Sequence, residues 1–423
     1  MDNESPEGII DDQGKDLSKV VQARYRAMVD GDANPHEWAH AWRSEVNRGG
    51  FKAVDFLMDE IVDTGKCVGC AACVVICPVD VFDYEDERPV DARHDACVYC
   101  ELCVDVCPVL RPTDTDLETL LDYREPVVDE GFGPYSYALL ASSNDAKIRD
   151  KGQDGGVVTS LLIYALEKGI IQGTIVGDVR EDNPHIPVQK LATTPEEILN
   201  CIGSRYTYSP NTVALAEAVR KEIRPIAVVG VPCQIDGVRQ AQYSGIYLDL
   251  AEWYRKNIAF TIGLFCSEAF THESIDVLCK EFDLLPTDIE NINVKGKVIL
   301  TLKDGRELIF SLKEYQKYAR PACLYCLDYA ADHADIGVGG IGLTGWTFSA
   351  IRTEAGHAIF QAAIDDGWLE TRPVDEEPRS KSLLIKLSEK KRNRPLPAQM
   401  PTLQERIAMG KLDPKTFYES KEG

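Results

Sequence analysis

The chain has 423 residues, enough for two or three domains, and 44% of them are hydrophobic, as in an ordinary globular protein. Its net charge of −23 argues against nucleic acid as a partner, because binding a phosphate backbone requires a basic surface. No apolar run reaches membrane-helix length, and the acidic start MDNESPEGIIDDQGKD is unlike a signal peptide, so we expect a cytoplasmic location.

The first segment, residues 1–60, is predicted to be a helical extension. The stretch DLSKVVQARYRAMVDG places apolar residues at helix-like intervals, and PHEWAHAWRSEVNRG also has a helical composition. We expect this extension to pack on the next domain or on a partner protein.

Residues 61–112 carry two cysteine motifs, CVGCAACVVICP from Cys67 and CVYCELCVDVCP from Cys97. Each has the spacing C-x₂-C-x₂-C-x₃-C-P of bacterial two-cluster ferredoxins, in which the fourth cysteine of one motif ligates the other cluster. This resemblance predicts a small α+β ferredoxin domain with two [4Fe-4S] clusters. It assigns one cluster to Cys67, Cys70, Cys73 and Cys107, and the other to Cys97, Cys100, Cys103 and Cys77.

Residues 113–134 have the composition of an acidic connector with one short helix, and the pattern changes from residue 135. Between residues 135 and 375, apolar strand-like runs such as YSYALLASS, IAVVG and IAFTIGLF alternate with helical stretches, which predicts an α/β domain. Asp304-Gly305 in KVILTLKDGRELIFSL predicts a hairpin, and hence an antiparallel insertion. The charged, Pro-containing tail from residue 376 to 423 is expected to be a wrapping arm or partly disordered.

Four further cysteines in the α/β domain form a second constellation: Cys233, Cys266, Cys323 and Cys326. Cys233 and Cys266 each follow a predicted buried strand, and ligands in open α/β sheets collect at the carboxyl ends of strands. The number of cysteines fits one more cluster, but ordinary buried thiols explain the composition equally well. Cys201 is an alternative member of the set, and Cys279, among apolar helix residues, is expected to be a core thiol.

The order of motifs from about residue 135 to 375 resembles the coenzyme F420 hydrogenase/dehydrogenase beta-subunit family. The motifs are GGVVTSLL, GSRY, GVPCQIDGVR, GLFC, CLYCLD followed by ADIGVGGIG, and WTFSAIRTEAG. The resemblance implies an FAD-binding domain that exchanges a hydride with the deazaflavin coenzyme F420. It also implies that the four cysteines of the constellation hold a third [4Fe-4S] cluster beside the flavin.

Seven residues are candidates for contacts to the flavin, each with a structural alternative. Glycines at a helix start admit a phosphate, and basic or hydroxyl side chains bind phosphate or flavin oxygens; the alternatives are a plain helix cap and surface turns. The candidates are Gly155, Gly156, Thr159, Ser204, Arg205, Arg352 and Thr353. Asp154 stands where the family has serine, and an acid there would cap the helix or repel a pyrophosphate.

The sequence therefore predicts a flavin iron–sulfur oxidoreductase that passes electrons between coenzyme F420 and a partner protein. The expected partners are dehydrogenase, hydrogenase or heterodisulfide-reductase-type subunits, including complexes peripheral to a membrane, within a hetero-oligomer. One alternative is a ferredoxin-dependent reductase of an organic substrate with Tyr206 or Tyr208 as proton donor. Another is an electron-transfer subunit without activity toward coenzyme F420. No catalytic residue is assigned, because a hydride step needs position rather than an acid or base.

Overall fold

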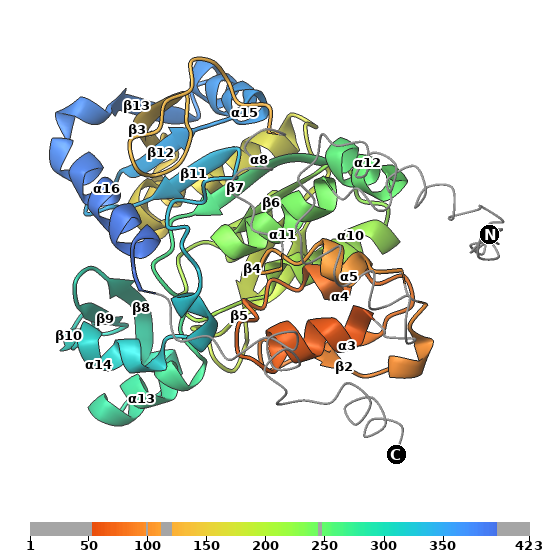
Figure 1. The fold of residues 1–423 in the computed structure, drawn as a ribbon. Helices are drawn as coiled ribbons and strands as arrows, with labels where there is room; N and C mark the ends of the chain where they lie inside the picture. Colours follow the sequence, from red (N-terminus) through yellow and green to blue (C-terminus); the bar gives the residue numbers. More distant parts are fainter. Residues whose placement is uncertain (1–52, 99, 111–120, 244–247, 396–423) are drawn as a thin grey trace, which may run out of the picture.

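The computed structural model describes residues 53–98, 100–110, 121–243 and 248–395. Figure 1 shows a small ferredoxin module packed against one side of a large α/β domain, with a small sheet below it. The predicted helical extension lies almost entirely outside the described residues. Residues 53–62 are helical and pack within the ferredoxin module, where Val54 and Leu57 share a core with Phe82 and Val104.

The ferredoxin module repeats one local structure around its two cysteine motifs. A short helix follows the second cysteine of each motif, and each helix is preceded by a residue in the left-handed region, Ala71 with φ 60° and Glu101 with φ 64°. A two-stranded hairpin separates the halves. The elements are α3 (Ala53–Leu57), a π-helical turn (Met58–Val62), α4 (Ala72–Ile76), β1 (Phe82–Glu85), β2 (Arg88–Asp91) and α5 (Leu102–Asp105).

The large domain is built on an eight-stranded mixed sheet in the order β13-β3-β12-β11-β7-β6-β4-β5. Its centre, β11-β7-β6-β4, is parallel, and both edges are antiparallel. The central strands β6 and β7 are apolar runs because parallel strands are covered on both faces. The strands are β3 (Tyr137–Ser143), β4 (Gly173–Val179), β5 (Pro187–Ala192), β6 (Ile226–Gly230), β7 (Ile258–Leu264), β11 (Ile336–Gly339), β12 (Thr347–Ile351) and β13 (Leu369–Pro373).

Helices cover both faces of this sheet, which confirms the predicted α/β class. One face packs against α8, α9 and α15 through a core that includes Leu161 and Phe360, and the other packs against α10, α11 and α12. The helices are α7 (Ala146–Lys151), α8 (Val157–Glu167), α9 (Pro195–Asn200), α10 (Ala214–Arg220), α11 (Pro232–Gln242), α12 (Leu248–Asn257) and α15 (Glu354–Asp365). None of the helices in the described residues is both long and apolar enough to cross a bilayer.

The antiparallel insertion lies between β7 and β11 as a three-stranded sheet, β10-β9-β8, at the lower left of Figure 1. Asp304-Gly305 forms the predicted hairpin between β9 and β10, with Gly305 at φ +87°. Its elements are α13 (Glu273–Phe282), β8 (Ile289–Val294), β9 (Val298–Leu302), β10 (Glu307–Phe310) and α14 (Leu312–Tyr315).

The tail lies within the described residues only up to residue 395, so the expectation of a wrapping arm or partial disorder stays a prediction for the rest. Residues 378–392 form the helix α16 (Pro378–Arg392), which packs beside β3 and β12 (Figure 1). Its buried Leu384 shares a core with Leu140 and Phe348, so a few apolar residues were enough to fix a highly charged helix. In the connector, residues 121–134 contain no helix, and the remainder lies outside the described residues.

Candidate functional site

The first cysteine set gathers four sulfurs at the inner side of the ferredoxin module. Cys67, Cys70, Cys73 and Cys107 line one hollow, and burial followed by the charges of its neighbours raises the pKa of Cys73. Backbone N–H groups of Gly69 and Ala72 point at the sulfurs of Cys67 and Cys70. Amide donors of this kind are typical of cluster-binding loops, because they stabilise thiolate sulfur.

The second cysteine set has a similar construction, and its Cys100 packs against the core that the module shares with the large domain. Burial, followed by the charges of Cys100, Cys97 and Cys77, raises the pKa of Cys103. The backbone N–H of Val81 donates to the sulfur of Cys77 at 3.3 Å. Each set therefore combines three cysteines of one motif with the fourth of the other, in the grouping that the sequence motif predicts.

The third cysteine set lines a hollow at the carboxyl edge of the central sheet. Cys233 begins α11 after β6, Cys266 follows β7, and Cys323 and Cys326 reach the same hollow from the segment after α14. Burial, then the charges of Cys326, Cys70, Cys266 and Cys323, raise the pKa of Cys233 well above its usual range. The N–H of Ala269 donates to the Cys323 sulfur at 3.4 Å.

The ferredoxin module and the third set meet at a close junction. The side chain of Arg320 donates to the carbonyl of Val68 at 2.9 Å, pairs with Glu87 at 2.5 Å and stacks on the ring of Tyr208 at 3.9 Å. The hydroxyl of Tyr208 donates to the Gly69 carbonyl at 2.8 Å. The first cysteine loop is thus held on the wall of the third hollow by a cation and an aromatic ring.

Two small residues bring the sulfurs of the two sets near one another. Gly237 of α11 faces Cys70, and a Cβ on Gly237 would lie 3.2 Å from the Cys70 sulfur. Thr212 donates its hydroxyl to the Cys70 carbonyl. Cys70 is consequently near enough for its charge to raise the proton affinity of Cys233.

The C-terminal helix closes the third hollow. The ammonium of Lys391 lies in its lining and donates to the carbonyl of Cys266 at 2.7 Å. Arg394 donates to the carbonyl of Cys326 at 2.6 Å. The sequence alone did not identify these residues, because a lysine in the run SEKKRNR shows no sign of being buried.

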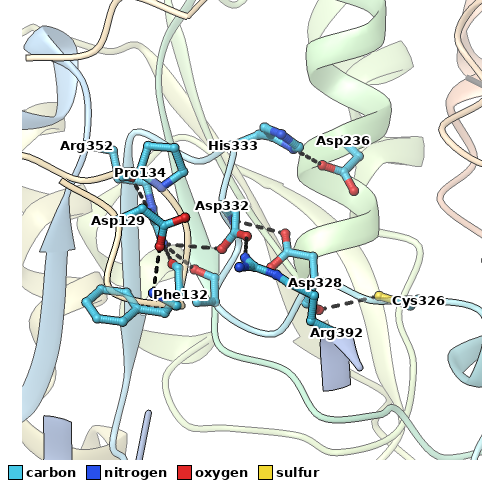
Figure 2. Close-up of polar contacts among 12 residues, drawn as sticks. Asp129, Phe132, Pro134, Asp236, Cys326, Asp328, Asp332, His333, Arg352 and Arg392 are labelled. Carbon is cyan, nitrogen blue, oxygen red and sulfur yellow. Dashed lines mark hydrogen bonds and ion pairs between the residues drawn. The ribbon is translucent and has the colours of Figure 1, made fainter. Parts of the chain in front are cut away.

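A charged network lies beside Cys326 and is shown in Figure 2. His333 bonds Asp236 at 2.8 Å, and Asp332 accepts a hydrogen bond from Arg392 at 2.7 Å. Asp236, Asp328 and His333 each place one polar atom within 4.8 Å of the others. The network joins α11, the segment before β11 and α16, so it positions the loop that carries Cys326.

The glycines proposed to contact the flavin open α8 at the same edge of the sheet. Gly156, with φ +70°, is the N-cap residue, and no side chain caps the helix. The first N–H groups of an uncapped helix favour an anion such as a pyrophosphate. Thr159 lies in this first turn and is buried.

Asp154 does not cap α8, contrary to one interpretation of the sequence. Its φ of 45° turns the carboxylate toward the small sheet, where it pairs with Lys295 at 2.9 Å. Its oxygen also fills the space beside Gly340, where a Cβ would lie 1.9 Å away. The acid that replaces the family's serine is therefore neutralised by a lysine.

Arg352 and Thr353 need correction as flavin contacts. The side chain of Arg352 is completely buried, and its guanidinium donates to the carbonyls of Pro134, Phe132 and Ala330 at 2.5–3.0 Å. Thr353 is the N-cap of α15 and donates to Asp335 at 2.6 Å. Both side chains bond to the protein itself, because the chain segments that meet here leave no exposed surface for a ligand.

The loop after α9 carries the other candidates. Arg205 donates from Nη1 to the carbonyls of Cys201, Ile202 and Gly203 at 2.7–3.0 Å, and so caps the carboxyl end of α9. Ser204 beside it is exposed. Cys201 packs against the core on the α8 side of the sheet, whereas Cys233 packs against the core on the α11 side, and Cys201 is not among the residues that line the third hollow. Cys279 lies in the core of the small sheet, as expected.

Comparisons with known proteins agree with these observations. Residues 138–216 and 223–377 match the family described as "Coenzyme F420 hydrogenase/dehydrogenase, beta subunit", by its N-terminal and C-terminal parts respectively. Residues 60–113 match the "4Fe-4S dicluster domain".

Individual relatives cover most of the chain. It is 36% identical to the coenzyme F420 hydrogenase subunit beta of Methanosarcina barkeri, over 67% of this chain and 96% of the relative. It is 32% identical to one subunit of the F(420)H(2) dehydrogenase of Methanosarcina mazei, over 79% of this chain and 91% of the relative. A solved structure of the F420-reducing [NiFe] hydrogenase complex from Methanosarcina barkeri contains a similar chain, with a TM-score of 0.59 and 36% identity, covering 63% of this chain and 91% of that one.

Proposed function

Because the chain belongs to the coenzyme F420 hydrogenase/dehydrogenase beta-subunit family, with a dicluster ferredoxin domain before it, we propose that it transfers electrons between coenzyme F420 and a partner redox protein. FAD, when bound, exchanges a hydride with the deazaflavin and exchanges single electrons with iron–sulfur clusters. The observation that carries the proposal is the third cysteine hollow, which is lined by Val68 of the first ferredoxin loop and by the four cysteines of the large domain.

The residues of the hollow fit a third [4Fe-4S] cluster. Four thiols converge from three segments, and an amide N–H points at one sulfur, as a cluster requires. We propose Cys233, Cys266, Cys323 and Cys326 as its ligands, and the first and second cysteine sets as the ligands of the two ferredoxin clusters.

The start of α8 fits the pyrophosphate of FAD. The helix has eleven residues, its N-terminal N–H groups lack a side-chain cap, and Lys295 neutralises the nearby Asp154. Gly155, Gly156 and Thr159 are therefore retained as proposed contacts, together with Ser204 and the remaining donors of Arg205. Arg352 and Thr353 are not.

The charges that act between cysteines of different sets support an electron path that runs through the three sets in series. Cys233 of the third set interacts with Cys70 of the first, and Cys73 and Cys107 of the first interact with Cys103 of the second. The second set also has an exposed neighbour, Val98, with 46% of its surface accessible. We propose that the partner docks here, as a subunit of a hydrogenase, dehydrogenase or heterodisulfide-reductase-type complex in the cytoplasm.

Tyr208, one of the two candidate proton donors of the alternative reductase, is buried and donates its hydroxyl hydrogen to the Gly69 carbonyl at the junction with the ferredoxin module. This contact favours a structural role for Tyr208. The alternative would then depend on Tyr206 as the proton donor.

An anaerobic mixing experiment tests the function. Reduced coenzyme F420 should bleach the flavin and cluster absorbance, while NADH and NADPH should leave it unchanged. Bleaching by reduced ferredoxin without any response to reduced coenzyme F420 would contradict the proposal and favour an electron-transfer subunit or a substrate reductase.

A cysteine substitution tests the third cluster separately. Cys323→Ser should lose about four of about twelve irons while FAD is retained, because only one cubane loses a ligand. The matched control is Cys279→Ser in the core of the small sheet, which should keep all its iron. Equal iron in wild type and Cys323→Ser would overturn the third cluster.

A further inference from the structure

The side chain of Lys391 is an unusual buried cation. Only 6% of the residue is exposed, and its Nζ contacts the Cys266 carbonyl at 2.7 Å in the lining of the third cysteine hollow. Within the part of the chain that the structure describes, no carboxylate lies within ion-pair distance of this ammonium. Burying an ammonium without an ion-pair partner is unfavourable, so an anion in the hollow would stabilise the folded protein.

Most neighbouring charges are paired with one another. Beside the hollow, Asp236 pairs with His333, and Asp332 pairs with both Arg352 and Arg392 (Figure 2). On the ferredoxin side, Arg320 pairs with Glu87. Asp328 acts on Lys391 through its charge from beyond ion-pair distance, so the cysteines that line the hollow with Lys391 are its remaining neighbours able to carry negative charge.

Neutral thiols give Lys391 no partner, whereas a cluster held by four thiolates carries a net negative charge. We propose that Lys391 is the counter-ion of the iron–sulfur cluster of the third set and raises the reduction potential of that cluster. This inference rests on the proposed function, since it needs a cluster in the hollow. It makes Lys391 a positioning residue, which acts through charge and ligates no iron.

The sign of the effect follows from electrostatics. An electron that enters the cluster adds one negative charge, and a cation buried nearby stabilises this reduced form more than the oxidised form. Low local dielectric keeps the interaction strong, because Lys391 and the cysteines around it are largely removed from solvent. Removing the charge should therefore make this cluster harder to reduce, and leave the ferredoxin clusters much less affected.

The position of Lys391 near the end of α16 allows its charge to be removed without removing the residue that attaches the helix to the domain. Lys391 lies in the last turn of α16, whose attachment to the domain is made by Leu384 two turns earlier. The adjacent Lys390 is exposed on the same helix and supplies a matched control. A substitution at either position changes the net charge of the protein by the same amount.

The experiment is an anaerobic redox titration of the purified full-length protein, followed by electron paramagnetic resonance and visible absorbance. Lys391→Met should lower the reduction potential of the third cluster. The expected change is about tenfold in the equilibrium constant for reduction, or about 59 mV for one electron. Lys391→Arg keeps the positive charge, so the potential of its third cluster should stay close to that of wild type. Lys390→Met should leave this potential unchanged. The cluster is assigned by comparison with Cys323→Ser, which lacks it.

Iron and flavin content separate the possible failures. If Lys391→Met keeps wild-type iron and the potential of the third cluster does not move, the counter-ion inference is wrong. An equal shift in Lys390→Met would also overturn it, because the effect would then be one of overall charge. If Lys391→Met binds less iron, the potential is measured in Lys391→Gln and Lys391→Arg, and equal potentials in those two variants would count against the inference. If Cys323→Ser already matches wild type in iron, the proposed third cluster fails instead.

Discussion

Arg352 shows how one side chain can hold several segments together. Its guanidinium donates to carbonyls of the loop before β3 and of the segment before β11, and it contacts no exposed surface. The charge is near Asp332, 3.7 Å away, which Arg392 of α16 also binds. A residue that the sequence motif suggested for the flavin thus has a structural task.

Replacing Arg352 should reveal that task. Arg352→Met leaves three buried carbonyls without a donor, so we expect the free energy of unfolding in urea to fall by about 3–5 kcal/mol. Arg124→Met, which removes an exposed pair with Glu354, should cost less than about 1 kcal/mol. Weaker FAD binding with unchanged stability would instead restore Arg352 as a flavin ligand.

His333 provides a pH-dependent contribution to stability. Burial opposes its charged form, but the hydrogen bond and charge of Asp236, with the charge of Asp328, outweigh burial and raise its pKa to about 9. The folded protein therefore holds the His333 proton more tightly than the unfolded chain, whose histidine has a pKa of about 6.5. The resulting stabilisation is complete below about pH 6.5 and is lost as the pH rises through about 9, a change of about 3 kcal/mol.

Urea unfolding under anaerobic conditions at about pH 6.5, 8 and 9.5 measures this loss. In Asp236→Asn the histidine loses its main partner, so the curve over that range should be nearly flat. A wild-type curve and an Asp236→Asn curve of equal slope would show that another group titrates.

Among the secondary-structure elements, α8 and the small sheet act together at the proposed flavin site. The uncapped start of α8 attracts an anion, while Asp154 beside it would repel one if Lys295 did not follow β8 at that point. The three-stranded insertion therefore contributes the positive charge of Lys295 to a site that is otherwise built on the eight-stranded sheet.

This cooperation can be measured as FAD affinity. Lys295→Met leaves the Asp154 carboxylate near the pyrophosphate, so the dissociation constant for FAD should rise roughly tenfold, equivalent to about 1.4 kcal/mol. Asp154→Asn in the same protein should restore the affinity, and Lys297→Met, an exposed change on the same turn, should leave it unaltered. Fluorescence titration of the deflavinated protein gives these values.

Local sequence patterns correctly predicted those strands and turns that depend mainly on neighbouring residues in the chain. The apolar runs at β6 and β7, the Asp304-Gly305 hairpin and the cysteine spacing each depend on a few neighbouring residues, and each strand and turn is found where the sequence indicated it. The helix α16 was missed because its stability comes from Leu384 packing on distant strands. The roles of Lys391 and Arg352 were missed for the same reason, since burial of a charge is decided by segments far away in the sequence.

On the scale of the whole molecule, the chain is strongly acidic, with a formal charge of −23. Near the second cysteine set, Asp80 and Asp83 are exposed, and Asp83 is paired with Arg93. A field of one sign steers a partner of opposite charge and weakens as salt screens it.

Ionic strength should therefore change electron delivery according to the charge of the acceptor. The bimolecular rate with cytochrome c, a basic protein, should fall severalfold between about 0.02 M and 0.5 M salt, and the rate with ferricyanide should rise. Stopped-flow measurements with the protein pre-reduced provide both rates. Equal salt dependence for the two acceptors would mean that the surface charge does not guide the encounter.

The junction at Gly69 has one more consequence. A Cβ there would lie 2.5 Å from the guanidinium of Arg320 in the large domain, and 2.4 Å from the Glu87 carbonyl within the ferredoxin module, so the loop packs tightly against both. A domain that moves between an electron donor and an acceptor needs an interface that can open. The interface between the ferredoxin module and the large domain is instead tightly packed. The ferredoxin module is a fixed extension of the large domain, and internal electron transfer should be as fast in a viscous solvent as in water.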